Sequence, residues 1–216
     1  MSGFRKRLIL LGAGDLAREV LWVATRVPAD ARDWHPGGIL ATEGGADDGL
    51  HALGLELPRL GAPADFVPDE HDVFICAVGA PRTKLELAAP LRARGAPFVN
   101  VIDPSAAVAP DATLGTGVFL SRQVTVSVGA RVGDDVSVNM YASIGHDVVL
   151  GDGCTVSSHC DLTGRAVAGR GVMFGSHAVV LPEGRVGDFA VVGAGTVVLR
   201  SVRAETSVFG VPARAL

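Results

Sequence analysis

Apolar residues recur at every sixth position through the second half of the chain, from Ile102 to Val198, seventeen times in succession. A second small or β-branched residue follows each of them by four positions, as Ala106 follows Ile102 and Val202 follows Val198. Neither an α-helix nor a hairpin meander has this period. The pattern predicts short flat strands joined by two-residue turns, three to a coil of 18 residues, with coils stacked about 4.8 Å apart.

Glycine comes directly after the apolar residue in eight of the seventeen units. Such a small residue near each corner lets the backbone turn without crowding. The pattern is that of a hexapeptide β-helix, a triangular prism expected over residues 101–216. Known prisms of this kind wind left-handed, against the usual crossover preference, so we expect a left-handed parallel β-helix.

The first hundred residues have different periods. The stretches "RLILLGAG", "GGIL" and "DVFICAVG" read as strands, whereas "DLAREVLWVATRV" and "PRTKLELAAPLRARG" have the spacing of helices. Alternating strands and helices predict a small, Rossmann-like parallel sheet. From Ala41 to Asp72 the Gly-, Pro- and Asp-rich sequence predicts a long loop with at most one short strand. We therefore predict two domains, residues 1–100 and 101–216.

Composition narrows the possible functions. The net charge of -4 gives no support to nucleic-acid or anionic-membrane binding, and no apolar run approaches a membrane span of about 18 residues. The apolar run after "FRKR" ends in a glycine turn and not in a cleavage site, so a signal peptide is not expected and a cytoplasmic location is. The three cysteines form neither a disulfide framework nor a zinc spacing, and Cys154 and Cys160 fall at inward positions of the prism.

The first glycine turn is a candidate ligand site. Residues 12–17, "GAGDLA", fit the G-x-G-x-x-A form in which glycines let a phosphate approach a helix N-terminus. A dinucleotide enzyme would also carry an acidic residue at the end of the second strand, and Glu43 is poorly placed for that. A tight turn required by packing, or a different nucleotide ligand, explains this turn better than NAD does.

Three histidines of the predicted prism are candidates for chemistry. By the 18-residue repeat, His159 and His177 should form one column with Tyr141, whereas His146 occupies a different corner, so the three should not converge on one metal ion. Histidine titrates near pH 6.5, which suits a general base, and Asp147 could orient the imidazole of His146. The same repeat places Arg165 beside Asp147, and a salt bridge between them is the competing structural use of that carboxylate.

With a small α/β domain, a G-x-G turn and an uninterrupted prism, the chain resembles the bacterial sugar acetyltransferases of the NeuD/PglD type over nearly its whole length. The most specific stretches are "VNMYASIGHDVVLGDG", "FGSHAVVLPEGRVGDFAVVGAGTVV" and "VFGVPAR". The resemblance implies a homotrimer that binds acetyl-CoA between adjacent prisms and acetylates a nucleotide-linked amino sugar, such as a 4-amino-deoxyhexose, for surface-glycan synthesis. It implies His146 as catalytic base, Asp147 as the neighbour that raises its basicity, and Asn139 as a further catalytic position.

The resemblance also implies binding residues. Contacts to acetyl-CoA are implied for Thr155, Gly175, Ser176, Gly193, Ala194 and Arg214. Contacts to the nucleotide-linked sugar are implied for Gly12, Gly14, Asp15, Leu16, Ala41 and Gly79. No metal ligand is implied.

Several positions depart from the family pattern. Many relatives have Gly-His where this chain has Asp15-Leu16, aspartates where it has Ala41-Thr42, and a second histidine where it has Thr155. These departures bear on the acceptor more than on acetyl-CoA. O-acetylation of a sugar such as sialic acid therefore stays open, as do a zinc-dependent β-helix hydrolyase or hydratase and a prism that binds without catalysing.

Overall fold

The computed structural model describes residues 6–41 and 57–216, and Thr42 and Glu43 lie outside them. The amino-terminal part contains β1 (Lys6–Leu11), α1 (Asp15–Arg26), the 3-10 turn η1 (Ala29–Ala31), β2 (Trp34–Leu40), β3 (Asp72–Cys76) and α2 (Pro81–Ala93). The strands form a parallel sheet in the order β2-β1-β3, as expected from the alternating pattern. Within the described residues, no helix is long and apolar enough to cross a membrane.

Local sequence accounts for these elements. Strands β1 and β3 are continuous apolar runs because helices α1 and α2 bury both faces of the parallel sheet. The second strand begins three residues before the expected "GGIL", at Trp34, whose ring is buried against α1. Helix α2 begins with Pro81 and is followed by Gly95, whose φ of 75° suits the end of a helix.

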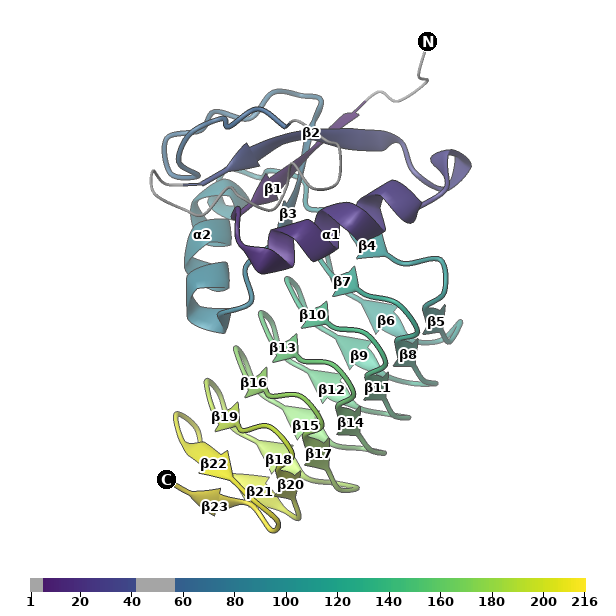
Figure 1. Ribbon diagram of the computed structural model, residues 1–216, viewed down its shortest axis with the longest axis vertical. Helices are drawn as coiled ribbons and strands as arrows, with labels where there is room; N and C mark the ends of the chain where they lie inside the picture. The colour runs from purple at the N-terminus through teal and green to yellow at the C-terminus, as the bar shows by residue number, and fades with distance from the viewer. Residues whose placement is uncertain (1–5, 42–56) are drawn as a thin grey trace.

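The rest of the chain forms a parallel β-helix of two-residue strands (Figure 1). They are β4 (Val101–Ile102), β5 (Ala107–Val108), β6 (Thr113–Leu114), β7 (Phe119–Leu120), β8 (Thr125–Val126), β9 (Arg131–Val132), β10 (Ser137–Val138), β11 (Ser143–Ile144), β12 (Val149–Leu150), β13 (Thr155–Val156), β14 (Asp161–Leu162), β15 (Val167–Ala168), β16 (Met173–Phe174), β17 (Val179–Val180), β18 (Arg185–Val186), β19 (Val191–Val192), β20 (Val197–Val198), β21 (Ser201–Val202), β22 (Ser207–Phe209) and β23 (Arg214–Ala215). The predicted fold class, a small parallel sheet followed by a left-handed hexapeptide β-helix, is confirmed, whereas the domain boundary at residue 100 stays a prediction.

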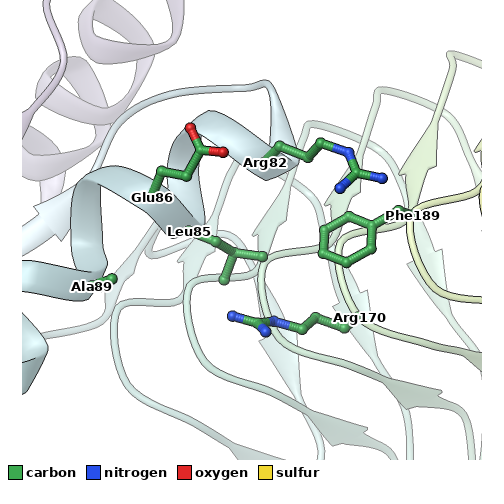
Figure 2. A pocket seen from close by; sticks show the side chains of 6 residues that line it. All are labelled: Arg82, Leu85, Glu86, Ala89, Arg170 and Phe189. Carbon is green, nitrogen blue, oxygen red and sulfur yellow. The ribbon is translucent and has the colours of Figure 1, made fainter.

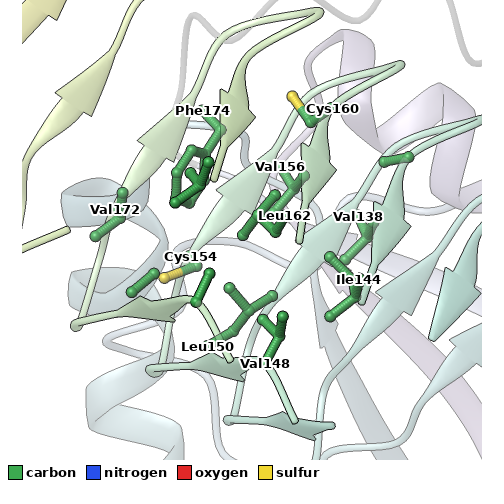
Figure 3. Close-up of a cluster of buried hydrophobic side chains, with 14 of the residues drawn as sticks. Val138, Ile144, Val148, Leu150, Cys154, Val156, Cys160, Leu162, Val172 and Phe174 are labelled. Atoms are coloured by element: carbon green, nitrogen blue, oxygen red, sulfur yellow. The ribbon is translucent and has the colours of Figure 1, made fainter. Parts of the chain in front are cut away.

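The second residue of each strand fills the interior of the prism (Figure 3). From Leu120 to Val198 these side chains are almost fully buried. Cys154 and Cys160, each the residue before a strand, are buried in the same interior, as predicted. The interior is built from aliphatic layers, with Phe174 as its one aromatic residue among the buried members. A repeat of stacked apolar layers is therefore sufficient to hold the coils together.

Three sheets form the faces of the prism, with eight, six and six strands, and all neighbours are parallel except β22 and β23. We call the face of β4, β7, β10, β13, β16, β19 and β22 the covered face, because α1 and α2 lie over it. Turns stacked on one another form the three edges of the prism. The Tyr141 edge, which contains the turn between β10 and β11, and the Asp135 edge, which contains the turn between β9 and β10, border this face. The His146 edge joins the other two faces, so it lies opposite the covered face.

The amino-terminal domain covers only the first coils. Outward side chains of the covered face are buried at Phe119, Ser137 and Thr155, but the next two, Met173 and Val191, emerge progressively to 41 % exposure at Val191. The remaining strip of this face is therefore open to solvent below α2.

From Gly117 to Gly195, the second residue of each turn has a left-handed backbone. Non-glycine residues with φ between 54° and 64° recur at these positions, and Asp147 with 58° is one of them. Tertiary stacking therefore imposes a conformation that side chains other than glycine adopt only rarely. This geometry fixes the backbone of the turn that contains His146 and Asp147.

Candidate functional site

His146 and Asp147 form the turn between β11 and β12, on the His146 edge. The imidazole Nδ1 lies 2.9 Å from Asp147 Oδ2, with the two side chains 50 % and 59 % exposed. Backbone hydrogen bonds hold the turn on both sides, from Asp147 N–H to Val128 O and from Arg165 N–H to His146 O. A solvent-accessible imidazole is therefore fixed on a rigid backbone.

This pairing selects one role for each nitrogen of the imidazole. A carboxylate that accepts the Nδ1 proton leaves Nε2 as the nitrogen with a free lone pair. Within the described residues, Nε2 of His146 forms no protein hydrogen bond. The pair can therefore take up a proton at Nε2, and Asp147 would stabilise the resulting imidazolium.

The competing salt bridge of Asp147 does not form. Arg165 lies on the next coil as expected, but its Nε is 3.2 Å from Glu183 Oε1. The salt bridge left open as the competing use of Asp147 is therefore not formed: the guanidinium extends toward the following coil, where Glu183 occupies the same turn position. The carboxylate of Asp147 is left to His146.

Five other expected site residues gather along the Tyr141 edge. They repeat at 18-residue intervals in two adjacent columns, and they are Asn139, Gly175, Ser176, Gly193 and Ala194. Within the described residues, Asn139 Oδ1 is buried without a hydrogen-bond partner.

The two glycines of this group have a packing role of their own. A Cβ at Gly175 would lie 2.6 Å from the backbone nitrogen of Ala194, and one at Gly193 would collide with the ring of Phe209. Stacking of neighbouring coils is therefore sufficient to require both glycines. Arg214 is exposed on β23, which pairs antiparallel with β22 beside them.

Thr155 occupies a different environment from the one expected. Its side chain is buried on the covered face, where Oγ1 donates to Gly79 O at 2.7 Å and accepts from Lys84 Nζ at 2.8 Å. Lys84 also donates to Ser137 Oγ and Cys154 O. The hydroxyl of Thr155 is thus used to join α2 to the prism, and it does not face solvent.

Burial lowers the pKa of Lys84 to about 8. The unfolded chain keeps the proton to about pH 10.4, so above pH 8 the unfolded state binds more protons and the free energy of unfolding rises with pH. We expect the free energy of unfolding of the wild type to rise by about 1 kcal/mol relative to that of Lys84→Met between pH 7 and pH 9. Urea denaturation at one protein concentration measures it, and parallel pH profiles for the two proteins would contradict it.

Six residues implied for the acceptor lie at the carboxyl ends of the parallel strands, where ligands of open α/β sheets bind. They are Gly12, Gly14, Asp15 and Leu16 after β1, Ala41 after β2, and Gly79 after β3. The structure brings these residues to one end of the sheet.

The three glycines of this group differ in whether packing requires them. Gly12 has φ 107°, and a Cβ there would lie 2.6 Å from the side chain of Val78, so packing requires it. A Cβ at Gly14 or Gly79 would meet nothing within 4 Å, so open space lies at the start of α1 and of α2. Asp15 is fully exposed at the start of α1. It lines a hollow of about 400 Å³ together with Arg18, Glu19 and Trp22. Leu16 and Ala41, in contrast, pack on the core of the amino-terminal domain.

A second hollow lies between α2 and the Asp135 edge (Figure 2). It has a volume of about 220 Å³, and the guanidinium of Arg82 lies 4.1 Å over the ring of Phe189 and 2.9 Å from Glu205. Arg170 lines the opposite wall, and Glu86 of α2 lines the hollow as well, so charges of both signs adjoin an apolar floor. Sequence reasoning missed Arg82, Arg170, Phe189 and Lys84, because contacts between α2 and the prism join residues far apart in the chain.

The remaining histidines stack on one another. Ring centroids are 5.0 Å apart between Tyr141 and His159 and 4.8 Å apart between His159 and His177, which confirms the predicted column. Stacked rings present their faces to each other, not their nitrogens. Within the described residues, no group of three or more His, Cys, Asp or Glu side chains is placed to hold a metal ion.

Comparison with known proteins agrees with this architecture. Residues 129–163 match the family model "Bacterial transferase hexapeptide (six repeats)". Among curated protein sequences, none matches this chain significantly.

Solved structures match over nearly the whole chain. A mutant of perosamine N-acetyltransferase from Caulobacter crescentus, in complex with CoA and GDP-perosamine, is 27% identical, with a TM-score of 0.84 and coverage of 97% of this chain and 96% of that chain. The acetyltransferase domain of PglB from Neisseria gonorrhoeae, in complex with acetyl coenzyme A, is 25% identical, with a TM-score of 0.83 and coverage of 99% and 100%. The resemblance to sugar N-acetyltransferases of the hexapeptide type is confirmed.

Proposed function

We propose that this chain, which resembles the hexapeptide-repeat sugar N-acetyltransferases, transfers an acetyl group from acetyl-CoA to the amino group of a nucleotide-linked amino sugar. A 4-amino-deoxyhexose destined for a surface glycan is the proposed acceptor. The pair of His146 and Asp147, with Nε2 unoccupied by protein partners, is the observation that carries this proposal. Both substrates are cytoplasmic metabolites, so we place the reaction in the cytoplasm.

Direct transfer needs no covalent enzyme intermediate. The acceptor nitrogen attacks the thioester carbonyl, its proton passes to Nε2 of His146, and the C–N bond forms as the carbonyl oxygen becomes an oxyanion. Collapse of this intermediate breaks the C–S bond and releases the thiol of CoA, which takes up the proton. Asp147 stabilises the imidazolium between these steps, and a backbone N–H of a coil turn is the proposed oxyanion donor.

The proposed site needs two copies of the chain. The acceptor residues lie above the covered face, whereas His146 stands on the edge opposite that face. Within one chain, the whole thickness of the prism separates the base from Gly14 and Gly79. A neighbouring copy that presents its His146 edge to the covered face would complete the site, and a closed homotrimer supplies three such sites.

The residues of the Tyr141 edge are the proposed acetyl-CoA contacts. Gly175, Ser176, Gly193 and Ala194 offer backbone close to solvent along one edge, and Arg214 offers a cation near a phosphate of CoA. Thr155 does not contact acetyl-CoA in this proposal. Its hydroxyl instead fixes the position of Gly79 at the proposed acceptor site by donating a hydrogen bond to the carbonyl oxygen of that residue. The acceptor is proposed to bind at Gly12, Gly14, Asp15, Leu16, Ala41 and Gly79.

Thiol release from acetyl-CoA tests the proposal against a panel of nucleotide-linked 4-amino and 3-amino sugars, with the corresponding hydroxyl sugars in parallel. We expect release with one amino sugar, and product mass identifies the acetylated nitrogen. Release with a hydroxyl sugar alone would replace N-acetylation with O-acetylation. Absence of release with every sugar would overturn the proposed reaction.

A further inference from the structure

Gly164 stands out among the turn residues of the prism. The first residue of each turn, two positions after the repeating apolar residue, is Pro, Thr, Arg, Val, Asp, Met, His, Ser or Ala at sixteen of the seventeen repeats, and glycine only at position 164. The backbone of this position therefore accepts a Cβ readily. Gly164 also lies outside the left-handed region of φ, so backbone conformation does not require glycine there.

What fills the space above Gly164 is the imidazole of His146. A Cβ at residue 164 would collide with Nε2, Cε1 and Cδ2 of that ring, and Nε2 is the nearest atom. The ring therefore rests on the backbone of the next coil, and Gly164 is buried although it belongs to an exposed turn.

The Tyr141 edge shows the alternative arrangement. There Tyr141, His159 and His177 follow one another on successive coils, and the rings of His159 and His177 stand face to face at 4.8 Å, nearly parallel at 2°. On the His146 edge, the missing side chain at position 164 instead lets the imidazole lean over the following coil. Asp147 then holds the ring at Nδ1 while the backbone of Gly164 supports its opposite side.

We infer that Gly164 is a positioning residue for His146, whose ring it seats with Nε2 against the following coil. This inference rests on the proposed function only for its kinetic consequence, since the contact itself belongs to the fold. A methyl group at position 164 would lift the ring and displace Nε2 from the position at which it meets the acceptor nitrogen. A displacement of about 1 Å can lower a rate by about 10²-fold.

The test is Gly164→Ala, with kcat and KM measured by thiol release and with the ¹⁵N-imidazole NMR signals of His146 recorded alongside. We expect kcat to fall between about 10-fold and 10²-fold, KM for acetyl-CoA to stay within about twofold, and the His146 signals to shift. A rise confined to KM for acetyl-CoA would mean that the glycine serves the cofactor, and it would overturn the inference. Unmoved His146 signals would also overturn it.

The matched control is the same substitution in the His146→Ala background. With the ring gone, the methyl group has room, so Gly164→Ala should raise the Tm there and lower it in the presence of His146. Equal Tm changes in the two backgrounds would overturn the contact. If His146→Ala leaves kcat unchanged, the proposed base is wrong, whereas the NMR and Tm results still decide the role of Gly164.

Discussion

His146→Ala is expected to lower kcat by at least about 10²-fold while the affinity for acetyl-CoA stays within about twofold. The imidazole is half exposed, and its bond to Asp147 is at the surface, so its removal leaves no cavity and the fold should persist. The loss arises because, among the described residues, no other histidine lies on this edge to accept the proton. Steady-state thiol release gives kcat, and calorimetry with CoA gives the affinity.

Two further variants make this result specific. His71→Ala removes an exposed imidazole of the amino-terminal domain that contacts Glu70, and it should leave kcat unchanged. Asp147→Asn should slow the reaction more modestly, because the amide still reaches Nδ1 but stabilises the imidazolium less. A kcat of His146→Ala equal to that of the wild type would remove His146 as the base.

Mixed oligomers of two inactive variants are expected to regain activity. Gly79→Glu would fill the space before the first turn of α2 and block the acceptor, and it should fold because a Cβ there meets nothing within 4 Å. His146→Ala removes the base. If base and acceptor domain come from different copies, each mixed trimer regains one of its three sites, which is about a quarter of all sites when the two variants mix randomly in equal amounts.

Co-expression with two different tags, followed by two affinity steps, isolates the mixed oligomers. Each variant alone should show no more than about 1% of wild-type turnover, because one lacks the general base and the other cannot bind the acceptor. The control pairs His146→Ala with the double variant His146→Ala/Gly79→Glu, which leaves every site without a base and should stay inactive. Absence of recovery in verified mixed oligomers would mean that each chain completes its own site.

The prism could be predicted from the sequence because its order is local. A repeat of six residues specifies strand, turn and inward position together, and it also placed His159 over His177 and both Cys154 and Cys160 in the interior. The pair of His146 and Asp147 was predictable for the same reason, since the two residues are adjacent in one turn.

Contacts between the domains could not be predicted in this way. Lys84 meets Thr155 across 71 positions, and Arg92 pairs with Asp135 through two hydrogen bonds across 43 positions. No periodicity relates such partners, so Thr155 was expected at a ligand and is found under α2. The role of Gly164 was equally hidden, because a missing side chain gives no signal until the neighbouring coil is in place.

Helix α2 touches the prism at three heights, through Arg92 at Asp135, Lys84 at Thr155 and Arg82 at Phe189. Ten helical residues rise about 15 Å, and the three coils between Asp135 and Phe189 rise about 14 Å. The length of the helix between Arg82 and Arg92 therefore matches the height of the coils that it contacts. Duplicating one coil inside this span would displace one of these contacts by about one strand spacing of 4.8 Å relative to α2. The prism can therefore be lengthened by whole coils only beyond the part that α2 contacts.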